Sequence, residues 1–313
     1  RGRPVTTKQR AHSSEYFGAE RNFFWNRDYI GLVAARLALK KVRCALDVGC
    51  GRGHWSAVLL PWLSDDLRLT GVDHEEEHVA HYKAVMSTAL RAGASGALRA
   101  SAERLPFPDN HFGLSTCQTL LMHVKEPQAV MNEMARVVEP GGIVLCAEPN
   151  NVVARLPLGG TLMEQDPNEL VLVAELAMRV AIGKERRGLG SEAVGERLPA
   201  LMQNAGLFDV QVWISDKAFV DLPPYDSDEE RARLSTARTH QEEGIGAFDE
   251  ADARADFLAS GGSPAQFARC WSAFEASWHE AERGRRHGTW RAAGGGLMYL
   301  VAGRKPSSEA SSA

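Results

Sequence analysis

The sequence predicts an α/β protein in which helices cover both faces of an open, mostly parallel β-sheet. Apolar segments alternate with amphipathic segments through residues 44–150, and this alternation is typical of parallel β-α-β units. Gly49, Gly51 and Gly53 follow the first apolar segment directly and indicate a tight turn between a strand and a helix. Glycine lets the backbone approach a ligand closely, and the first amides of a helix face it. A cradle for a small molecule is therefore expected here.

Seven segments are expected as strands, at residues 44–48, 68–73, 98–100, 114–118, 142–147, 210–215 and 298–303. Helices are expected at 29–41, 54–63, 74–92, 128–138 and 198–205, with a mostly apolar helix inside 151–195. The long interval between the last two strands is expected to be helical, because capping boxes start at Ser227 and Ser263.

These elements divide the chain into a ligand-binding core and additions to it. The expected parts are an aromatic and helical cap (1–43), the core (44–150), a helical insertion (151–197), a core helix and strand (198–215), a helical lid insertion (216–296), a last core strand (297–305) and a disordered tail (306–313). We expect the cap and both insertions to meet over the edge of the sheet where parallel strands end, and there to exclude water.

Composition narrows the class of partner and the compartment. The formal net charge of −4 argues against a nucleic-acid partner. Five cysteines without a C-x-x-C pair indicate free thiols in a reducing compartment. We see no apolar stretch of a secretory signal near residue 1, and the most apolar run, 170–183, is too short to span a bilayer. A cytoplasmic protein without a membrane span is expected.

The spacing of the glycine turn excludes two common cradles. A dinucleotide fingerprint needs a third glycine where His54 stands, and no Lys-Ser or Lys-Thr follows as in a phosphate-binding P-loop. Asp47 precedes the first glycine by two residues. Its carboxylate would repel a phosphate but suits a ligand with a cationic amino acid group.

The pattern acid-x-G-x-G-x-G from Asp47 to Gly53 resembles the first motif of class I S-adenosylmethionine (SAM)-dependent methyltransferases. Residues 101–112 read Ser-Ala-Glu-Arg-Leu-Pro-Phe-Pro-Asp-Asn-His-Phe and closely resemble a segment of the ubiquinone/menaquinone-biosynthesis type, also called type 11. Residues 117–124, Cys-Gln-Thr-Leu-Leu-Met-His-Val, and residues 133–142, which end in Glu-Pro-Gly-Gly, are also similar to it.

The resemblance covers about residues 44–150, with weaker agreement at 198–215 and 298–305. It implies a Rossmann-like doubly wound, mostly parallel seven-stranded sheet with helical lid insertions, and S-adenosyl-L-methionine as cofactor. One departure is Gly113, where the family usually has an aspartate. This departure loosens the expected start of a strand.

Residues that match the family's motifs are expected to bind the cofactor. Asp73 ends the second strand and is expected to accept hydrogen bonds from both ribose hydroxyls, with a helix N-cap role as the alternative. The resemblance puts His74 beside the adenine and makes the segment from Ser101 to Glu103 its border. The full expected set is Asp47, Gly49, Cys50, Gly51, Gly53, Asp73, His74, Ser101, Ala102, Glu103 and Gln118.

His123 and Glu148 are the candidate catalytic residues. Each follows a strand at the ligand-binding edge, where it could act as a general base or orient a hydroxyl acceptor. The alternatives are a structural hydrogen bond for His123 and a helix-cap role beside Pro149 for Glu148. Methyl transfer from a sulfonium is an in-line displacement that needs mainly positioning, so no metal is expected.

Three further groups of residues have competing interpretations. His74, His78 and His81 could hold a metal, but a solvated helix face is favoured. An aromatic stripe at helical spacing is either core or a roof over an apolar substrate, and a basic cluster is either a solvated face or an anion site. The stripe is Phe267, Trp271, Phe274 and Trp278, and the basic cluster is Arg283, Arg285, Arg286, His287 and Arg291.

The function expected from these motifs is methyl transfer from SAM to O, N or C of a small apolar or aromatic acceptor. The alternatives are a protein or RNA methyltransferase that uses the basic cluster, and a non-catalytic SAM-binding module, which Gly113 weakly supports. Acceptor identity and oligomeric state do not follow from the sequence.

Overall fold

A seven-stranded sheet with the order β3-β2-β1-β4-β5-β9-β6 forms the centre of the computed structural model, which describes residues 18–91, 94–154, 166–294 and 296–307. Neighbouring strands are parallel except around β9, which is antiparallel to both β5 and β6. The predicted mostly parallel sheet is confirmed. Its strands are β1 (Cys44–Val48), β2 (Arg68–Asp73), β3 (Ser95–Arg99), β4 (Phe112–Gln118), β5 (Val138–Asn150), β6 (Phe208–Ile214) and β9 (Leu297–Arg304).

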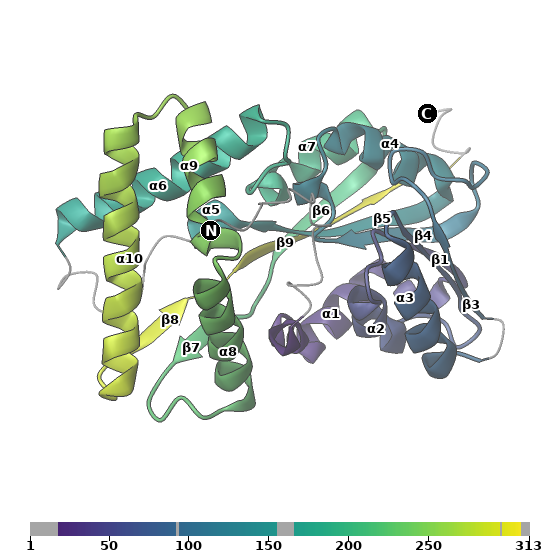
Figure 1. Ribbon diagram of the computed structural model, residues 1–313. Helices are drawn as coiled ribbons and strands as arrows, with labels where there is room; N and C mark the ends of the chain where they lie inside the picture. The colour runs from purple at the N-terminus through teal and green to yellow at the C-terminus, as the bar shows by residue number, and fades with distance from the viewer. Residues whose placement is uncertain (1–17, 92–93, 155–165, 295, 308–313) are drawn as a thin grey trace.

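Helices cover both faces of this sheet (Figure 1). Adjacent residues of β1 show the two faces, because Ala45 packs into the core with α1–α3 whereas Leu46 packs into the core with α4 and α7. A strand buried on both faces needs apolar residues at successive positions, which explains the continuous apolar runs in the sequence. The helices are α1 (Arg27–Leu37), α2 (His54–Leu59), α3 (Glu76–Ala89), α4 (Pro127–Val137) and α7 (Leu198–Asn204).

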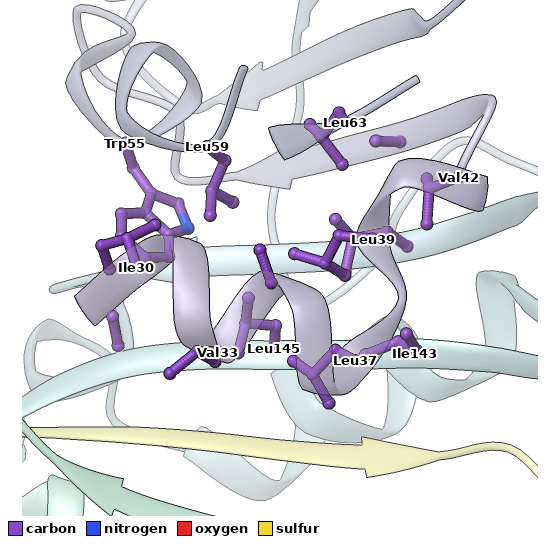
Figure 2. Packing of buried hydrophobic residues seen from close by; sticks show 14 of the residues in the cluster. Ile30, Val33, Leu37, Leu39, Val42, Trp55, Leu59, Leu63, Ile143 and Leu145 are labelled. Atoms are coloured by element: carbon purple, nitrogen blue, oxygen red, sulfur yellow. The ribbon is translucent and has the colours of Figure 1, made fainter. Parts of the chain in front are cut away.

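Helix α1 shows how the N-terminal cap is joined to the core. Ile30, Val33 and Leu37 recur at helical spacing and lie against β5 and α2 (Figure 2). All three side chains are almost fully buried, and the helix ends at Ala38, which has left-handed backbone geometry (φ 56°). The cap is therefore an integral layer of the core from α1 onward.

The two insertions form a helical lid beside the sheet (Figure 1). Both predicted capping boxes are present, at Ser227 before α8 and at Ser263 before α10. The expectation of an entirely helical second insertion is wrong, because β7 and β8 pair antiparallel within it. Strands of three residues are too short to show periodicity. The lid elements are α6 (Pro167–Arg186), β7 (Phe219–Asp221), α8 (Asp228–Glu243), α9 (Glu250–Ala259), α10 (Pro264–Arg286) and β8 (Ala292–Gly294).

Several short elements connect these layers, and a few boundaries differ from prediction. β3 begins three residues earlier than expected, and β5 is longer at both ends. No helix in the described part of the chain is long and apolar enough to cross a membrane. Most of the expected tail, 308–313, lies outside the described residues. The connecting elements are η2 (Ala19–Phe23), η3 (Leu39–Lys41), η4 (Leu60–Trp62), η5 (Leu121–His123), α5 (Asn151–Ala154), η7 (Val194–Arg197) and η8 (Gly246–Phe248).

The aromatic stripe of α10 belongs to a separate core of the lid. Phe267 and Trp271 are buried with residues of α6 and α9, and Phe274 and Trp278 pack on Phe248. None of the four stripe residues lines the cavity described below. The interpretation of the stripe as core is confirmed, and the roof over a substrate is wrong.

Arg285 lies in a different environment from the other four residues of the basic cluster. This side chain is 9% exposed, forms ion pairs with Asp221 (2.7 Å) and Glu282 (2.8 Å), and lies over the Trp278 and Trp290 rings. The solvated-face interpretation is wrong for Arg285, because its guanidinium is largely buried and ion-paired inside the lid. The other four residues of the cluster are exposed, as expected.

Gly183 of α6 permits a close approach between two lid helices. A Cβ at this position would overlap the backbone carbonyl of Asp256 in α9. Gly183→Ala is therefore expected to lower the free energy of unfolding by about 2 kcal/mol through steric overlap, although alanine favours a helix by about 1 kcal/mol. Urea unfolding measures the change, with Gly96→Ala as the matched control because nothing lies within 4 Å of its added Cβ. A Gly183→Ala protein as stable as the wild type would contradict the close packing of α6 on α9.

Candidate functional site

A cavity of about 770 Å³ lies at the edge of the sheet where β1, β2, β4 and β5 end. The cap contributes Glu20, Arg21 and Phe24 to its lining, the first insertion contributes Lys184, Gly188 and Glu192, and the second contributes Lys217 and Phe219. The start of the antiparallel strand β9 reaches the same edge, and Met298 therefore also lines the cavity. The cap and both insertions thus meet over the ends of the parallel strands.

The glycine turn after β1 forms one wall of the cavity. Gly49, Gly51 and Gly53 have φ values of 67°, 49° and 87°, in the region where other residues are strained. A Cβ on Gly49 would lie 2.7 Å from the Leu120 side chain. Gly49, Cys50 and Gly51 line the cavity, whereas Gly53 lies outside its lining as the residue before α2.

Asp73 is the buried acid of the site. Its carboxylate is 7% exposed, lines the cavity and accepts the backbone N–H of Gly51 at 2.9 Å and of Glu75 at 3.0 Å. Helix α3 begins only at Glu76, so the alternative role of Asp73 as an N-cap is wrong. Asp73 instead joins the glycine turn to the end of β2.

The three histidines near Asp73 have different environments. His78 is buried, lines the cavity and lies with Nδ1 3.3 Å from Asp73 Oδ1. The solvated-face interpretation is wrong for His78, because its place on α3 points it toward the carboxylate. His74 and His81 are exposed, and His74 also lines the cavity.

Asp47 lies in β1, two residues before the glycine turn, and outside the cavity lining. Its side chain is fully buried and accepts a hydrogen bond from Ser56 Oγ at 2.6 Å, while Ser56 also bonds the Tyr82 hydroxyl. Burial raises the pKa of Asp47 to about 7, and the nearby Asp73 carboxylate adds to the rise. Asp47 therefore holds the start of α2 through Ser56 and does not line the cavity.

This raised pKa gives a pH dependence of stability. An acid whose folded pKa lies above its unfolded value binds a proton in the folded state, so stability is lost as pH rises through the folded pKa. As the pH rises from about 5.5 to 8, the titration of Asp47 is expected to lower the free energy of unfolding by about 2 kcal/mol. Asp47→Asn removes this contribution and keeps an acceptor for Ser56. Relative to the wild type, the variant should therefore gain about 2 kcal/mol at the higher pH, as measured by urea unfolding. Glu148 titrates in the same direction in both proteins, so its contribution cancels in the comparison. A difference in unfolding free energy between the variant and the wild type that is the same at both pH values would contradict the titration of Asp47.

Gln118 and His54 form a polar pair where β4 ends. Gln118 is buried, and its Oε1 lies 3.3 Å from His54 Nδ1, while its Nε2 has no hydrogen-bond partner among the described residues. Burial and the charge of Arg21 lower the pKa of His54, which favours a neutral imidazole. Both residues line the cavity. The sequence gives Gln118 a site role but gives none to His54, although its position directly after the glycine turn is a signal.

The segment after β3 lines the cavity with Ser101, Ala102 and Glu103. The Ser101 hydroxyl accepts the backbone N–H of Glu103 at 3.2 Å and so turns the chain there. Among the described residues, this segment shares the cavity with Asp73 and the glycine turn. The predicted cofactor residues outside the lining are Asp47 and Gly53.

Glu148 does not lie where a base is needed. It is fully buried and outside the cavity lining, and its carboxylate accepts the backbone N–H groups of Leu120, Leu121 and Met122 at 2.8, 2.8 and 3.3 Å. The expectation of a catalytic Glu148 is corrected, because its side chain anchors the segment after β4. Burial raises its pKa to about 7.

His123 is the candidate that reaches the cavity. It is exposed at the end of η5 and lines the cavity beside Val124 and Lys125. Asn151, Lys184 and Glu192 line the same end, and the sequence had given them no role. No local motif marks these three residues, because they meet only when the first insertion folds back onto β5.

Comparison with known proteins gives the family. Residues 46–146 match the model of a methyltransferase domain. Demethylmenaquinone methyltransferase of Bacillus pumilus is 30% identical over 182 residues, which cover 53% of this chain and 71% of the relative. The enzyme of the same name from Bacillus mycoides is 28% identical over 206 residues, covering 62% and 80%. The demethylmenaquinone methyltransferase of Geobacillus stearothermophilus is 32% identical over 134 residues. This match covers 41% of this chain and spans about half (53%) of the relative.

Solved structures show the same fold. The YcgJ protein of Bacillus subtilis superposes with a TM-score of 0.51 at 16% identity, over 90% of this chain and 99% of that protein. The match to the Bacillus pumilus relative, at 30% identity over 71% of that protein, shows the family of this chain. S-adenosyl-L-methionine is the methyl donor of that family. The chain belongs to the class I SAM-dependent methyltransferases.

Proposed function

We propose that this chain transfers a methyl group from SAM to O, N or C of a small apolar or aromatic acceptor. The observation that carries the proposal is that one cavity is lined both by the glycine turn with Asp73 and by apolar side chains from the cap, the second insertion and β9. The cofactor end holds the glycine turn and Asp73. The acceptor end is bordered by Phe24, Phe219 and Met298, which come from the cap, the second insertion and β9.

The residues at the cofactor end suit SAM in shape and chemistry. The Asp73 carboxylate can accept the ribose hydroxyls, and the segment from Ser101 to Glu103 can border the adenine. The unpartnered Gln118 Nε2 is a buried donor that a ligand can satisfy. When bound, SAM supplies a methyl group already activated on a sulfonium. This chain then needs to bind, orient and exclude water.

The size and cover of the cavity favour a small-molecule acceptor over a macromolecule. Arg21 of the cap reaches Thr119 of the core at 3.3 Å, and Glu20 accepts a hydrogen bond from Thr236 of α8 at 2.7 Å. The cap therefore lies across the cavity between the core and the lid. The relatives are named for demethylmenaquinone, which is a quinone and not a macromolecule. We place the protein in the cytoplasm, since its five cysteines are free thiols.

A labelled-methyl assay tests this proposal. The protein is incubated with SAM labelled in its methyl group and with a cell extract, which is then separated into solvent-extractable small molecules, RNA and protein. Label is expected in the small-molecule fraction and should be absent with Asp73→Ala. Label in protein or RNA would favour the alternative acceptors. Binding of SAM without labelling of any fraction would favour the non-catalytic module.

His123 is the histidine that we assign to a hydroxyl acceptor as its base, because it lines the cavity in the segment that follows β4, next to Val124 and Lys125. Its imidazole lines the acceptor end, and general-base catalysis contributes roughly 10²- to 10⁴-fold. His123→Ala is therefore expected to lower kcat on a hydroxyl acceptor by about 100-fold with SAM affinity unchanged, as measured by initial rates and calorimetry. His81→Ala, on an exposed face of α3, is the matched control. An unchanged kcat would remove His123 from proton transfer.

A further inference from the structure

Four polar residues, His123, Lys125, Lys184 and Glu192, line the acceptor end of the cavity beyond β4 and β5. We refer to them as the polar wall. Lys184 and Glu192 form an ion pair whose side chains are only 13% and 5% exposed. Charges so deeply placed need partners, and a charged pair that faces a cavity is poised to meet a ligand's charge.

The polar wall is held rigidly by contacts between three segments. The Ser191 N–H donates to the Met122 carbonyl at 3.1 Å, and a Cβ on Gly190 would overlap that carbonyl. The Asn151 backbone N–H donates to the Glu192 carbonyl at 2.7 Å, and the Asn151 side chain donates to Glu192 Oε2 at 2.9 Å. The segment that carries Glu192 is therefore fixed to both η5 and the end of β5. Such a site needs little rearrangement to bind a ligand.

The two ammonium groups of the polar wall outweigh its single carboxylate. Lys125 makes no ion pair with any described residue. A Cβ added to Gly188 would lie 3.5 Å from Lys125 Cδ, so the lysine stem packs on the first insertion. Glu192 already accepts from Lys184 and Asn151. The surplus positive charge faces a cavity whose other lining includes Phe24, Phe219 and Met298. A cation beside an apolar cavity attracts an anion more strongly than it would in water.

We propose that the polar wall binds an anionic oxygen of the acceptor: a phenolate, an enolate or a carboxylate on an otherwise apolar body. The inference rests on the proposed function, because it assigns the acceptor end of the same cavity. Lys184 and Lys125 supply the positive charge, and Glu192 holds the Lys184 ammonium in place. The same charge disfavours an acceptor with a protonated amine.

Two probes of nearly equal shape test the charge preference. Isothermal titration calorimetry is done on the full chain saturated with S-adenosylhomocysteine, so that neither probe can enter the cofactor end. The anionic probe is 2-naphthoate and the neutral probe is 2-naphthamide. We expect the wild type to bind 2-naphthoate at least about tenfold more tightly.

Variants assign the preference to the polar wall. The triple variant Lys125→Met/Lys184→Met/Glu192→Gln removes both ammonium groups together with the carboxylate, so no surplus positive charge remains and no charge is left buried alone. It is expected to bind both probes about equally while keeping the wild-type affinity for S-adenosylhomocysteine and the wild-type affinity for 2-naphthamide. Lys217→Met is the matched control, since Lys217 also lines the cavity but is paired with Glu229 at 2.7 Å. It should keep the preference.

Three outcomes would overturn this inference. They are equal binding of the two probes to the wild type, binding of neither probe, and a preference that persists in the triple variant. These outcomes are separate from failure of the proposed function. That failure would appear as a lack of S-adenosylhomocysteine binding, or as the absence of methyl label in every extract fraction.

Discussion

Replacing Asp73 with alanine is expected to weaken SAM binding by about 4 kcal/mol, which is roughly a 1,000-fold rise in Kd. Two hydroxyl groups of the ribose would lose a charged acceptor, each such bond being worth about 1.5–3 kcal/mol. The same carboxylate holds Gly51 of the turn at 2.9 Å, so its loss also loosens the cradle. Isothermal titration calorimetry with SAM measures the change directly.

Conservative and distant variants separate binding from folding at Asp73. Asp73→Asn keeps one acceptor oxygen and should lose only about tenfold in affinity. Asp65→Ala removes an exposed carboxylate of the same type, paired with Lys40 far from the cavity, and should leave Kd unchanged. An unaltered SAM affinity in a folded Asp73→Ala protein would show that Asp73 does not hold the ribose.

Glu148→Ala is expected to lower the free energy of unfolding by about 5 kcal/mol. The substitution leaves three buried N–H groups, those of Leu120, Leu121 and Met122, without an acceptor, and each such loss costs about 1–3 kcal/mol. These groups belong to the segment that leads into His123. Urea or thermal unfolding measures the change. If the protein folds, the acceptor KM should rise more than the Kd for SAM.

Glu148→Gln distinguishes this anchoring role from proton transfer. The amide oxygen can still accept the two N–H groups that bond Oε1, so the stability loss should be about 1–2 kcal/mol and kcat should stay close to the wild type. A base would behave differently, because glutamine cannot take a proton. A large drop in kcat with wild-type stability would return Glu148 to the catalytic residues.

The core and its cofactor end follow from local sequence. Residues 44–48 and 68–73 are apolar runs of strand length, and the structure gives the strands the same bounds. The glycine turn is visible because three alternate residues all need positive φ, which favours glycine. Asp73 is marked by its place at the end of the second strand. Each of these signals lies within a few residues of the feature that it predicts.

The lid and the acceptor end do not follow in this way. The β7–β8 pair joins residues more than 70 positions apart through strands of three residues, which have no readable period. The roles of Arg285 and His78 depend on partners, Asp221 and Asp73, that only packing brings near. Side chains of these types are exposed on most helices, so a solvated face was the natural expectation.

The sequence by itself determined the sheet and the glycine turn, because strand periodicity and backbone geometry constrain neighbouring residues directly, and the resemblance of its motifs to a known family implied the cofactor. Tertiary structure alone decided that Glu148 anchors a backbone segment, that Asp47 is buried against Ser56 of α2, and that Lys184 and Glu192 line the cavity. The physical reason is burial. Whether a carboxylate or an ammonium supports, binds or reacts depends on which distant groups exclude water from it, and those groups are chosen by the packing of the cap and the insertions on the core.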